Sequence, residues 1–180
     1  MSKQTVWITI GNIGSGKSTW SWMKASSNSL VSAVSQDLIR EMIHGGEYVF
    51  DEQLEQLVSK IAWNSIFEIL NYKRHLVIDE CNLSNVKRRE LIQKIRNTFP
   101  NVYIVGVIFP ILSDATHIAR RVKEPKIVAS EEKIKYAWNR VHAWLKNSFN
   151  FPVMNEGFDE LIDDYGVEIE MLGEQYENAI

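Results

Sequence analysis

The stretch that decides the fold is GNIGSGKST, residues 11–19, which follows the apolar run TVWITI and precedes the helix-forming run WSWMKASS. Residues 11–18 satisfy the pattern G-x-x-x-x-G-K-[ST], in the order strand, glycine loop and helix that distinguishes a phosphate-binding loop from a chance match. The glycines let the backbone curl so that successive N–H groups, and the positive end of the following helix, point at one anion. The sequence therefore predicts a loop that binds a nucleoside triphosphate.

Two side chains of this loop have expected roles of their own. We expect Lys17 to reach the β- and γ-phosphates of ATP, and the hydroxyl of Ser18 to bind Mg²⁺. A glycine turn with a surface lysine would be the plainer explanation, but it leaves the matching strand and helix unexplained. ATP and Mg²⁺ are thus the expected cofactors. The predicted nucleotide-binding residues are Gly11, Asn12, Ile13, Gly14, Ser15, Gly16, Lys17, Ser18 and Thr19.

Length and composition describe an ordinary globular chain. It has 180 residues, of which 45% are hydrophobic and 24% charged, and we expect one domain over residues 1–180 with a core of about 5–149. No apolar run approaches the ~20 residues of a membrane span, and the N-terminus lacks a signal-peptide pattern, so a cytoplasmic protein without a membrane contact is expected. Cys81 is the only cysteine, which excludes an internal disulfide. Four histidines show no metal-ligand spacing: His44, His75, His117 and His142.

Strand-like and helical patterns alternate along the chain. Leucine, isoleucine and valine recur near the 3.6-residue period in 52–70, after Ser84 and in 134–145. Such alternation is typical of a three-layer α/β sandwich with a mainly parallel sheet, to which the helices near the C-terminus would add a lid. The strand-like runs are 6–10, 30–35, 75–79, 102–109 and, more weakly, 158–163.

Charge is unevenly distributed. The net charge is −3, yet residues 151–180 hold nine of the 23 carboxylates and no lysine or arginine, so residues 1–150 carry all 20 basic residues and a balance of +6. A basic body is compatible with a polyanionic partner, and the acidic segment could compete for the same surface or simply be solvated. The nine carboxylates are Glu156, Asp159, Glu160, Asp163, Asp164, Glu168, Glu170, Glu174 and Glu177.

A second polar motif is SQDLIR, residues 35–40, at the end of an apolar run. Asp37 and Arg40 are three residues apart and share one face of a helix. In a parallel sheet of this order, we expect the end of the preceding strand to lie beside the phosphate-binding loop. Asp37 could then accept the proton of an attacking hydroxyl and Arg40 could hold an anionic substrate. A helix cap with a solvated arginine is the alternative explanation.

A third motif is HLVIDECNL, residues 75–83. Apolar residues lead into Asp79 at a strand end, the position of an aspartate that holds Mg²⁺ or its water in P-loop enzymes. Glu80, Cys81 and Asn82 follow as a polar cluster. Capping of the helix that starts near Ser84 would explain Asn82, but not a strand that ends in two carboxylates.

A fourth motif lies about 100 residues beyond the loop. Residues 117–138 are predicted to run from helix to basic loop to helix, with a flexible cationic segment formed by Arg120, Arg121, Lys123 and Lys126. An arginine delivered by a moving lid can stabilise the charge of a transferring phosphoryl group, so Arg120 and Arg121 are both candidates. A solvated charge run is the alternative.

Together, GNIGSGKSTW (11–20), SQDLIR, DECNL followed by KRR, and the arginine lid resemble the kinase domain of the phage 5′-hydroxyl polynucleotide kinases, over about residues 5–149. The resemblance implies that Lys17 and Ser18 handle ATP and metal. It also implies that Asp37 is the general base and Arg40 binds the acceptor's phosphate. Asp79 and Asn82 match the family's Asp-x-Thr-Asn segment approximately, with cysteine where the relatives have threonine.

The expected function is therefore ATP-dependent transfer of the γ-phosphoryl group to a hydroxyl of a nucleic-acid acceptor, DNA or RNA, as in a polynucleotide 5′-hydroxyl kinase. Asp37, Arg40 and Asn82 would bind that acceptor. Three alternatives remain open: a kinase of hydroxymethylated pyrimidines in phage DNA, a small-molecule nucleoside or nucleotide kinase, and a non-catalytic ATP-binding module. A base candidate such as Asp37 argues against the module, and the basic body favours a nucleic-acid acceptor. No residue pattern points to an oligomeric state.

Overall fold

A computed structural model describes residues 3–123 and 131–166 of the chain. It contains one parallel sheet with the strand order β2-β3-β1-β4-β5. Every neighbouring pair in this sheet is parallel, which confirms the expected α/β class. The strands are β1 (Thr5–Ile10), β2 (Val31–Val34), β3 (His75–Ile78), β4 (Tyr103–Ile108) and β5 (Glu160–Asp163).

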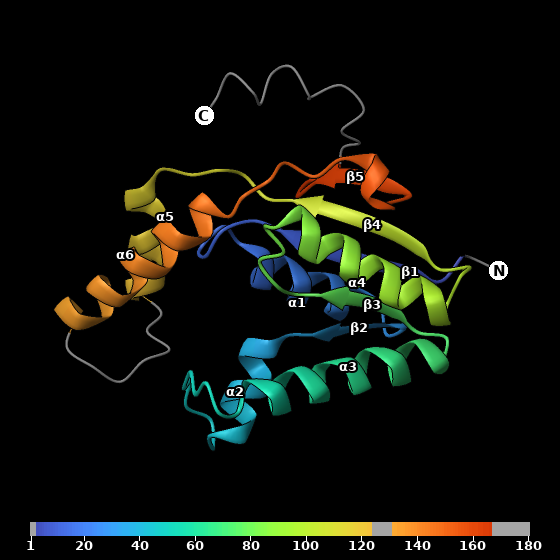
Figure 1. The fold of residues 1–180 in the computed structure, drawn as a ribbon, viewed down its shortest axis with the longest axis horizontal. Coiled ribbons are helices and arrows are strands. Elements are labelled where there is room, and N and C mark those ends of the chain that lie inside the picture. The colour runs from blue at the N-terminus through green and yellow to red at the C-terminus, as the bar shows by residue number, and fades with distance from the viewer. Residues whose placement is uncertain (1–2, 124–130, 167–180) are drawn as a thin grey trace.

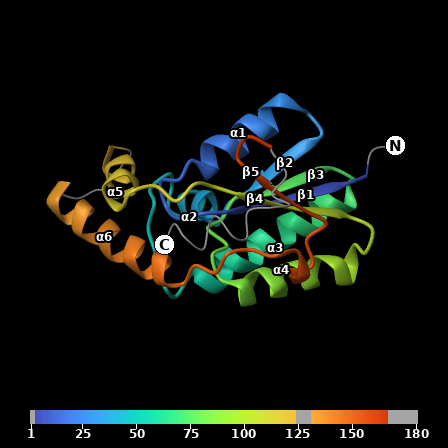
Figure 2. The ribbon, with the colours of Figure 1, turned by 90° about the horizontal axis from the view of Figure 1, so that it is seen from above.

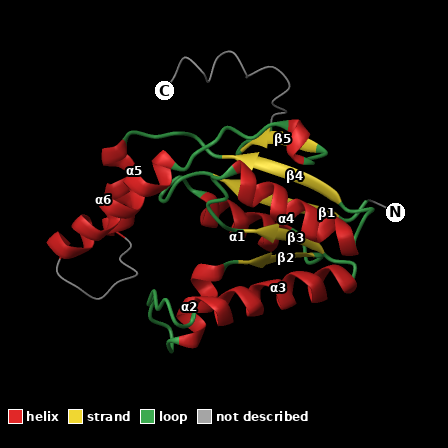
Figure 3. Ribbon diagram, viewed as in Figure 1, coloured by secondary structure: helices red, strands yellow, loops and turns green. Residues whose placement is uncertain are grey.

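Helices cover both faces of the sheet and form the expected three layers (Figures 2 and 3). One face carries α3 (Glu55–Asn71) and α4 (Asn85–Thr98), and the other carries α1 (Lys17–Ser27). Next to the end of β2 lies α2 (Gln36–Ile43). Beyond the carboxyl end of β4, α5 (Asp114–Lys123) and α6 (Glu131–Asn147) form a pair that we call the lid (Figure 1). A 3₁₀ helix, η1 (Met154–Glu156), precedes β5.

The central strand β1 shows why the apolar runs become buried strands. Its side chains alternate, so Val6 and Ile8 pack into the core with α3 and α4, whereas Trp7 packs with Trp20 of α1 on the opposite face. Strands β3 and β4 flank β1 on both edges. A strand that is covered on both faces and both edges needs apolar residues at nearly every position, as TVWITI provides.

Strand β2, which precedes Asp37, is separated from β1 by β3. One expectation needs correction. Arg120 and Arg121 were expected in a flexible basic segment, but they belong to helix α5, which runs to Lys123. Lys126 lies outside the described residues.

The acidic C-terminal segment is partly built into the fold. Arg88 and Glu156 form a doubly hydrogen-bonded ion pair at 2.6 and 2.7 Å, with both side chains fully buried. Arg88 also donates to the carbonyl of Asn150 at 2.9 Å, and Arg96 pairs with Asp159 at 2.7 Å. These contacts fix the segment that leads into β5 against α4. Two of the nine carboxylates are therefore structural, and residues 167–180 lie outside the described part.

Replacement of Arg88 by alanine is expected to lower the free energy of unfolding by about 3–5 kcal/mol, because Glu156 is left as an unpaired buried charge. Urea denaturation measures the change. The double variant Arg88→Met with Glu156→Leu should recover most of the loss. The exposed pair Lys87–Glu90 is the matched control, since Lys87→Ala should change stability by about 1 kcal/mol or less. An Arg88→Ala loss no greater than this control would contradict the structural role.

Among the described residues, no helix is both long and apolar enough to cross a membrane.

Candidate active site

The glycine loop between β1 and α1 forms a cradle open on one side. Gly14 and Gly16 have φ angles of 67° and 109°, in the left-handed region that favours glycine. A Cβ atom added at Gly14 would lie 2.7 Å from the carbonyl oxygen of His117, so the loop packs closely against α5. A Cβ atom at Gly16 would meet nothing within 4 Å. The loop thus offers backbone N–H groups and the N-terminus of α1, which starts at Lys17, to an anion.

Two side chains in the loop fit such an anion. The ammonium group of Lys17 is buried and donates to the carbonyl of Asn12 at 2.7 Å, which holds its charge over the loop. The hydroxyl of Ser15 is buried without a hydrogen-bond partner in the described part of the chain. Gly11 anchors the base of the loop, because its N–H donates to the carbonyl of Cys81 at 3.0 Å. The donor set therefore suits a triphosphate.

Asp79 lies at the end of β3, buried and next to Ser18. Burial raises the pKa of Asp79, while a hydrogen bond from Ser18 and the charge of Lys17 oppose that rise. Carboxylate and hydroxyl oxygens are ligands that Mg²⁺ accepts, and Mg²⁺ usually takes its other ligands from phosphates and water. No group of three or more His, Cys, Asp or Glu that could hold a metal occurs in residues 3–123 and 131–166. Ser18 and Asp79 could therefore hold the ion only together with a bound nucleotide.

Asp37 and Arg40 form the expected pair on α2. Arg40 Nη1 lies 2.9 Å from Asp37 Oδ1. The same guanidinium also binds Glu55 at the start of α3, through Nε at 2.8 Å and Nη2 at 2.6 Å. The hydrogen bond with Glu55 is the main cause that raises the pKa of Arg40, so its charge is permanent. Glu55 was not predicted, since its contact depends on how α2 and α3 meet.

The lid brings two arginines to the same region, with different partners. Arg121 Nη2 donates to Asp37 Oδ2 at 3.3 Å, and its guanidinium lies 4.7 Å from the ring centre of Trp138 on α6. Arg120 is exposed and donates to the carbonyl of Gly14 at 3.0 Å. Arg121 thus lies at the proposed base, whereas Arg120 holds the lid to the phosphate loop.

Two histidines whose rings contact each other complete this attachment of the lid. Leu112 N–H donates to Nε2 of His117 at 3.1 Å, so Nδ1 carries the proton and donates to the carbonyl of Ile13 at 2.7 Å. Burial is the main cause that lowers the pKa of His117, which favours this neutral form. The ring centre of His142 on α6 lies 4.9 Å from the ring centre of His117. The backbone carbonyl of His142 accepts a hydrogen bond from Asn12 Nδ2 at 3.3 Å. Both helices of the lid are therefore hydrogen-bonded to the glycine loop.

Most predicted site residues line one pocket of about 800 Å³. The pocket also has aromatic walls, Tyr48 and Phe50 from the segment after α2, and Trp138 and Trp144 from α6. Four predicted residues do not line it: Gly11, Asn12 and Ser15 of the loop, and Asn82, which lines a second pocket and donates to the carbonyl of Thr9 at 2.9 Å. The predicted residues in the larger pocket are Ile13, Gly14, Gly16, Lys17, Ser18, Thr19, Asp37, Arg40, Asp79, Arg120 and Arg121.

Comparison with known proteins identifies the family and the fold. The family model AAA_33, described as an AAA domain, matches residues 6–147. A chain of the Pnkp1/Rnl/Hen1 complex is 20% identical, with a TM-score of 0.53 over 72% of this chain and 41% of its own. A fungal RNA kinase is 12% identical, with a TM-score of 0.56 over 91% of this chain and 38% of its own.

A candidate kinase of Chloroflexus aurantiacus is 16% identical and has a TM-score of 0.63 over 90% of this chain and 88% of its own. The chain spans less than half the length of the Pnkp1-complex and fungal chains. At these identities the likeness shows the fold, that of P-loop kinases. The comparison with curated proteins gives no match.

Proposed function

Because the chain belongs to the AAA_33 family of P-loop kinases, we propose that it transfers the γ-phosphoryl group of ATP to a hydroxyl of a nucleic-acid acceptor, as polynucleotide 5′-hydroxyl kinases do. The observation that carries the proposal is one pocket that contains both the phosphate loop with Lys17 and the Asp37–Arg40 pair. The part of the pocket at the phosphate loop suits ATP, the phosphoryl donor. The part at Asp37 and Arg40 offers a base and a cation to the acceptor.

Each of these residues has a separate role in the reaction. Asp37 accepts the proton of the acceptor hydroxyl as that oxygen bonds to the γ-phosphorus, and the bond from the γ-phosphorus to the bridging oxygen breaks, leaving ADP. Lys17 and Arg121 stabilise the charge on the transferring group. Ser18 and Asp79 would hold Mg²⁺, which would supply positive charge to neutralise the phosphates.

Three observations support a nucleic-acid acceptor. Arg40 is oriented by two carboxylates, and a planar guanidinium fixed in this way can bind a phosphate next to the reacting hydroxyl. Residues 1–150 carry a balance of +6, which attracts a polyanion. Two of the structures with this fold are named for RNA repair or RNA kinase activity.

The direct test is transfer of label from γ-³²P-ATP to four acceptors: a 5′-hydroxyl DNA oligonucleotide, a 5′-hydroxyl RNA oligonucleotide, a duplex with hydroxymethylated pyrimidines, and free nucleosides. Label is expected on the 5′-hydroxyl oligonucleotides. Lys17→Ala, which should lower transfer about 10²- to 10³-fold, controls for contaminating kinases. Label on the modified duplex alone would show that the acceptor is hydroxymethylated DNA, and label on nucleosides alone would show that it is a small molecule. A folded protein that labels none of them would contradict kinase activity.

Arg40→Ala is expected to raise KM about 10- to 100-fold for an acceptor with a phosphate next to its reactive hydroxyl, the cost of a lost hydrogen bond to a charged group. KM for an unphosphorylated nucleoside should change little. Steady-state kinetics with a nucleoside 3′-monophosphate and the matching nucleoside measure both values. Arg89→Ala, an exposed arginine on α4, is the control. Equal effects of Arg40→Ala on the two acceptors would contradict phosphate binding.

A further inference from the structure

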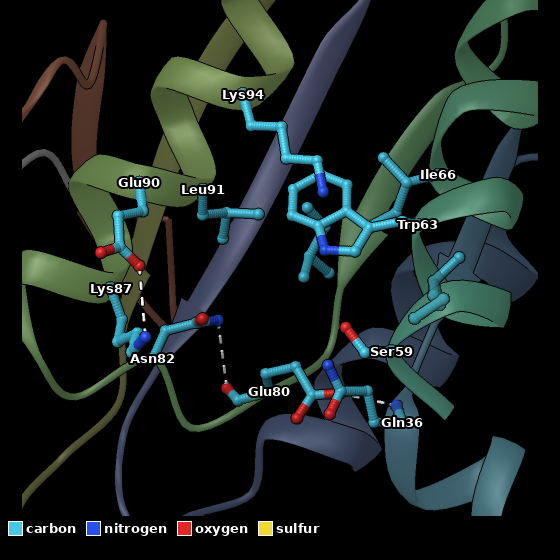
Figure 4. A pocket seen from close by; sticks show the side chains of 13 residues that line it. Gln36, Ser59, Trp63, Ile66, Glu80, Asn82, Lys87, Glu90, Leu91 and Lys94 are labelled. Atoms are coloured by element: carbon cyan, nitrogen blue, oxygen red, sulfur yellow. Dashed lines mark hydrogen bonds and ion pairs between the residues drawn. The ribbon is translucent and has the colours of Figure 1, made fainter. Parts of the chain in front are cut away.

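A second pocket, of about 430 Å³, lies between α3 and α4, above the ends of β2 and β3 (Figure 4). Its volume falls in the range of small-molecule sites. We call it the α3–α4 pocket. Six of its thirteen lining residues are apolar and seven are polar or charged, and they come from both helices and from the ends of both strands. The apolar residues are Val34, Ala62, Trp63, Ile66, Ile78 and Leu91.

Three polar side chains, Gln36, Glu80 and Asn82, meet at one end of this pocket (Figure 4). Gln36 N–H donates to Glu80 Oε1 at 2.6 Å. Within the described residues, Glu80 Oε2, Gln36 Nε2 and Asn82 Oδ1 make no hydrogen bond. This end therefore presents amide and carboxyl groups that are open to hydrogen bonds with a ligand.

A fixed ammonium group marks the opposite end. Lys94 Nζ lies 3.6 Å from the ring centre of Trp63, and Trp63 is itself stacked on Phe67. No carboxylate pairs with Lys94 in the part of the chain that the structure describes. The cation–π contact thus holds an uncompensated positive charge at the pocket.

The α3–α4 pocket adjoins the larger pocket through two residues. Glu80 lines both pockets. Gln36 directly precedes Asp37, and its Oε1 lies 3.4 Å from Arg40 Nη2. A group bound between α3 and α4 would therefore lie next to the acceptor hydroxyl at Asp37.

We propose that the α3–α4 pocket binds the nucleobase of the nucleotide whose hydroxyl is phosphorylated; this rests on the proposed function. A flat heterocycle suits the apolar wall, and its donors and acceptors match the amide and carboxyl groups of Gln36, Glu80 and Asn82, the groups that proteins use to read base edges. Lys94 would attract a phosphate of the same acceptor.

The test blocks the pocket with a bulky side chain. Ser59 lines it from α3, so Ser59→Phe should fill it, and Asn64→Phe places the same ring on the exposed side of the same helix. Calorimetry without ATP compares three probes: a 5′-hydroxyl dinucleotide, the same dinucleotide with an abasic 5′ residue, and a nucleoside 3′-monophosphate. The third probe shows whether one nucleotide is sufficient or a polynucleotide is needed.

The wild-type protein should bind the base-containing dinucleotide at least about tenfold more tightly than the abasic one, a difference of 1.4 kcal/mol. Ser59→Phe should bind the two equally, and Asn64→Phe should retain the preference. Equal binding by the wild type, or an unchanged preference in Ser59→Phe, overturns the proposal. If thermal unfolding shows that Ser59→Phe is not folded, Ser59→Leu replaces it.

Labelling assays with the same dinucleotides separate this proposal from the proposed function. Base-dependent binding without transfer to any hydroxyl would overturn the kinase assignment and leave the pocket standing. Transfer that uses the abasic acceptor equally well would overturn the pocket alone.

Discussion

Arg121→Ala is expected to lower kcat about 10³-fold or more, the effect of losing an arginine that stabilises a phosphoryl-transfer transition state. Arg120→Ala should lower it much less. The two residues are neighbours on α5, but only Arg121 reaches Asp37, at 3.3 Å, and it does so against the ring of Trp138. A guanidinium that is shielded from water acts more strongly on nearby charge than one that is exposed.

Single-turnover rates with saturating ATP measure this difference, and ATP affinity should be similar in both variants. Arg121→Lys keeps the charge but not the planar stack on Trp138, and it should recover only part of the rate. A larger loss in Arg120→Ala would reverse the assignment. Wild-type rates in both variants would exclude a transition-state role for the lid.

Asp37→Asn is expected to keep ATP binding and to lower kcat about 10²- to 10⁴-fold, the range of a positioned general base. The amide keeps the shape of the side chain but cannot take the proton of the acceptor hydroxyl. Rates and ATP affinity are measured on the same preparation. Glu55→Gln is the matched control, because it removes the other carboxylate of Arg40 without touching the base. Equal losses in the two variants, or an unchanged rate in Asp37→Asn, would reduce Asp37 to a partner of Arg40.

The features that the sequence predicted well are local ones. The strand before the loop needs only the run TVWITI, and the loop needs three glycines whose spacing allows the curl. The order of the strands was harder, because nothing in residues 31–34 or 75–78 says that β3 lies between β1 and β2.

The contacts that the sequence did not predict join residues far apart in the chain. Arg88 and Glu156 are 68 positions apart, and no local pattern distinguishes them from the many solvated charges around them. The two carboxylates after β3 are a partial exception. Side chains alternate beyond a strand, so Asp79 faces Ser18 while Glu80 faces Gln36. The sequence located both acids, but not which pocket each would serve.

The histidine contact between lid and loop has a thermodynamic consequence. The carbonyl of Ile13 accepts from His117, and Asn12 donates to the carbonyl of His142, so the same backbone that would surround the triphosphate also holds the helices that carry Arg121 and Trp138. A shift of the loop on nucleotide binding therefore changes the wall of the acceptor site. Linkage makes that coupling free energy reciprocal: whatever factor ATP imposes on acceptor affinity, the acceptor imposes on ATP affinity.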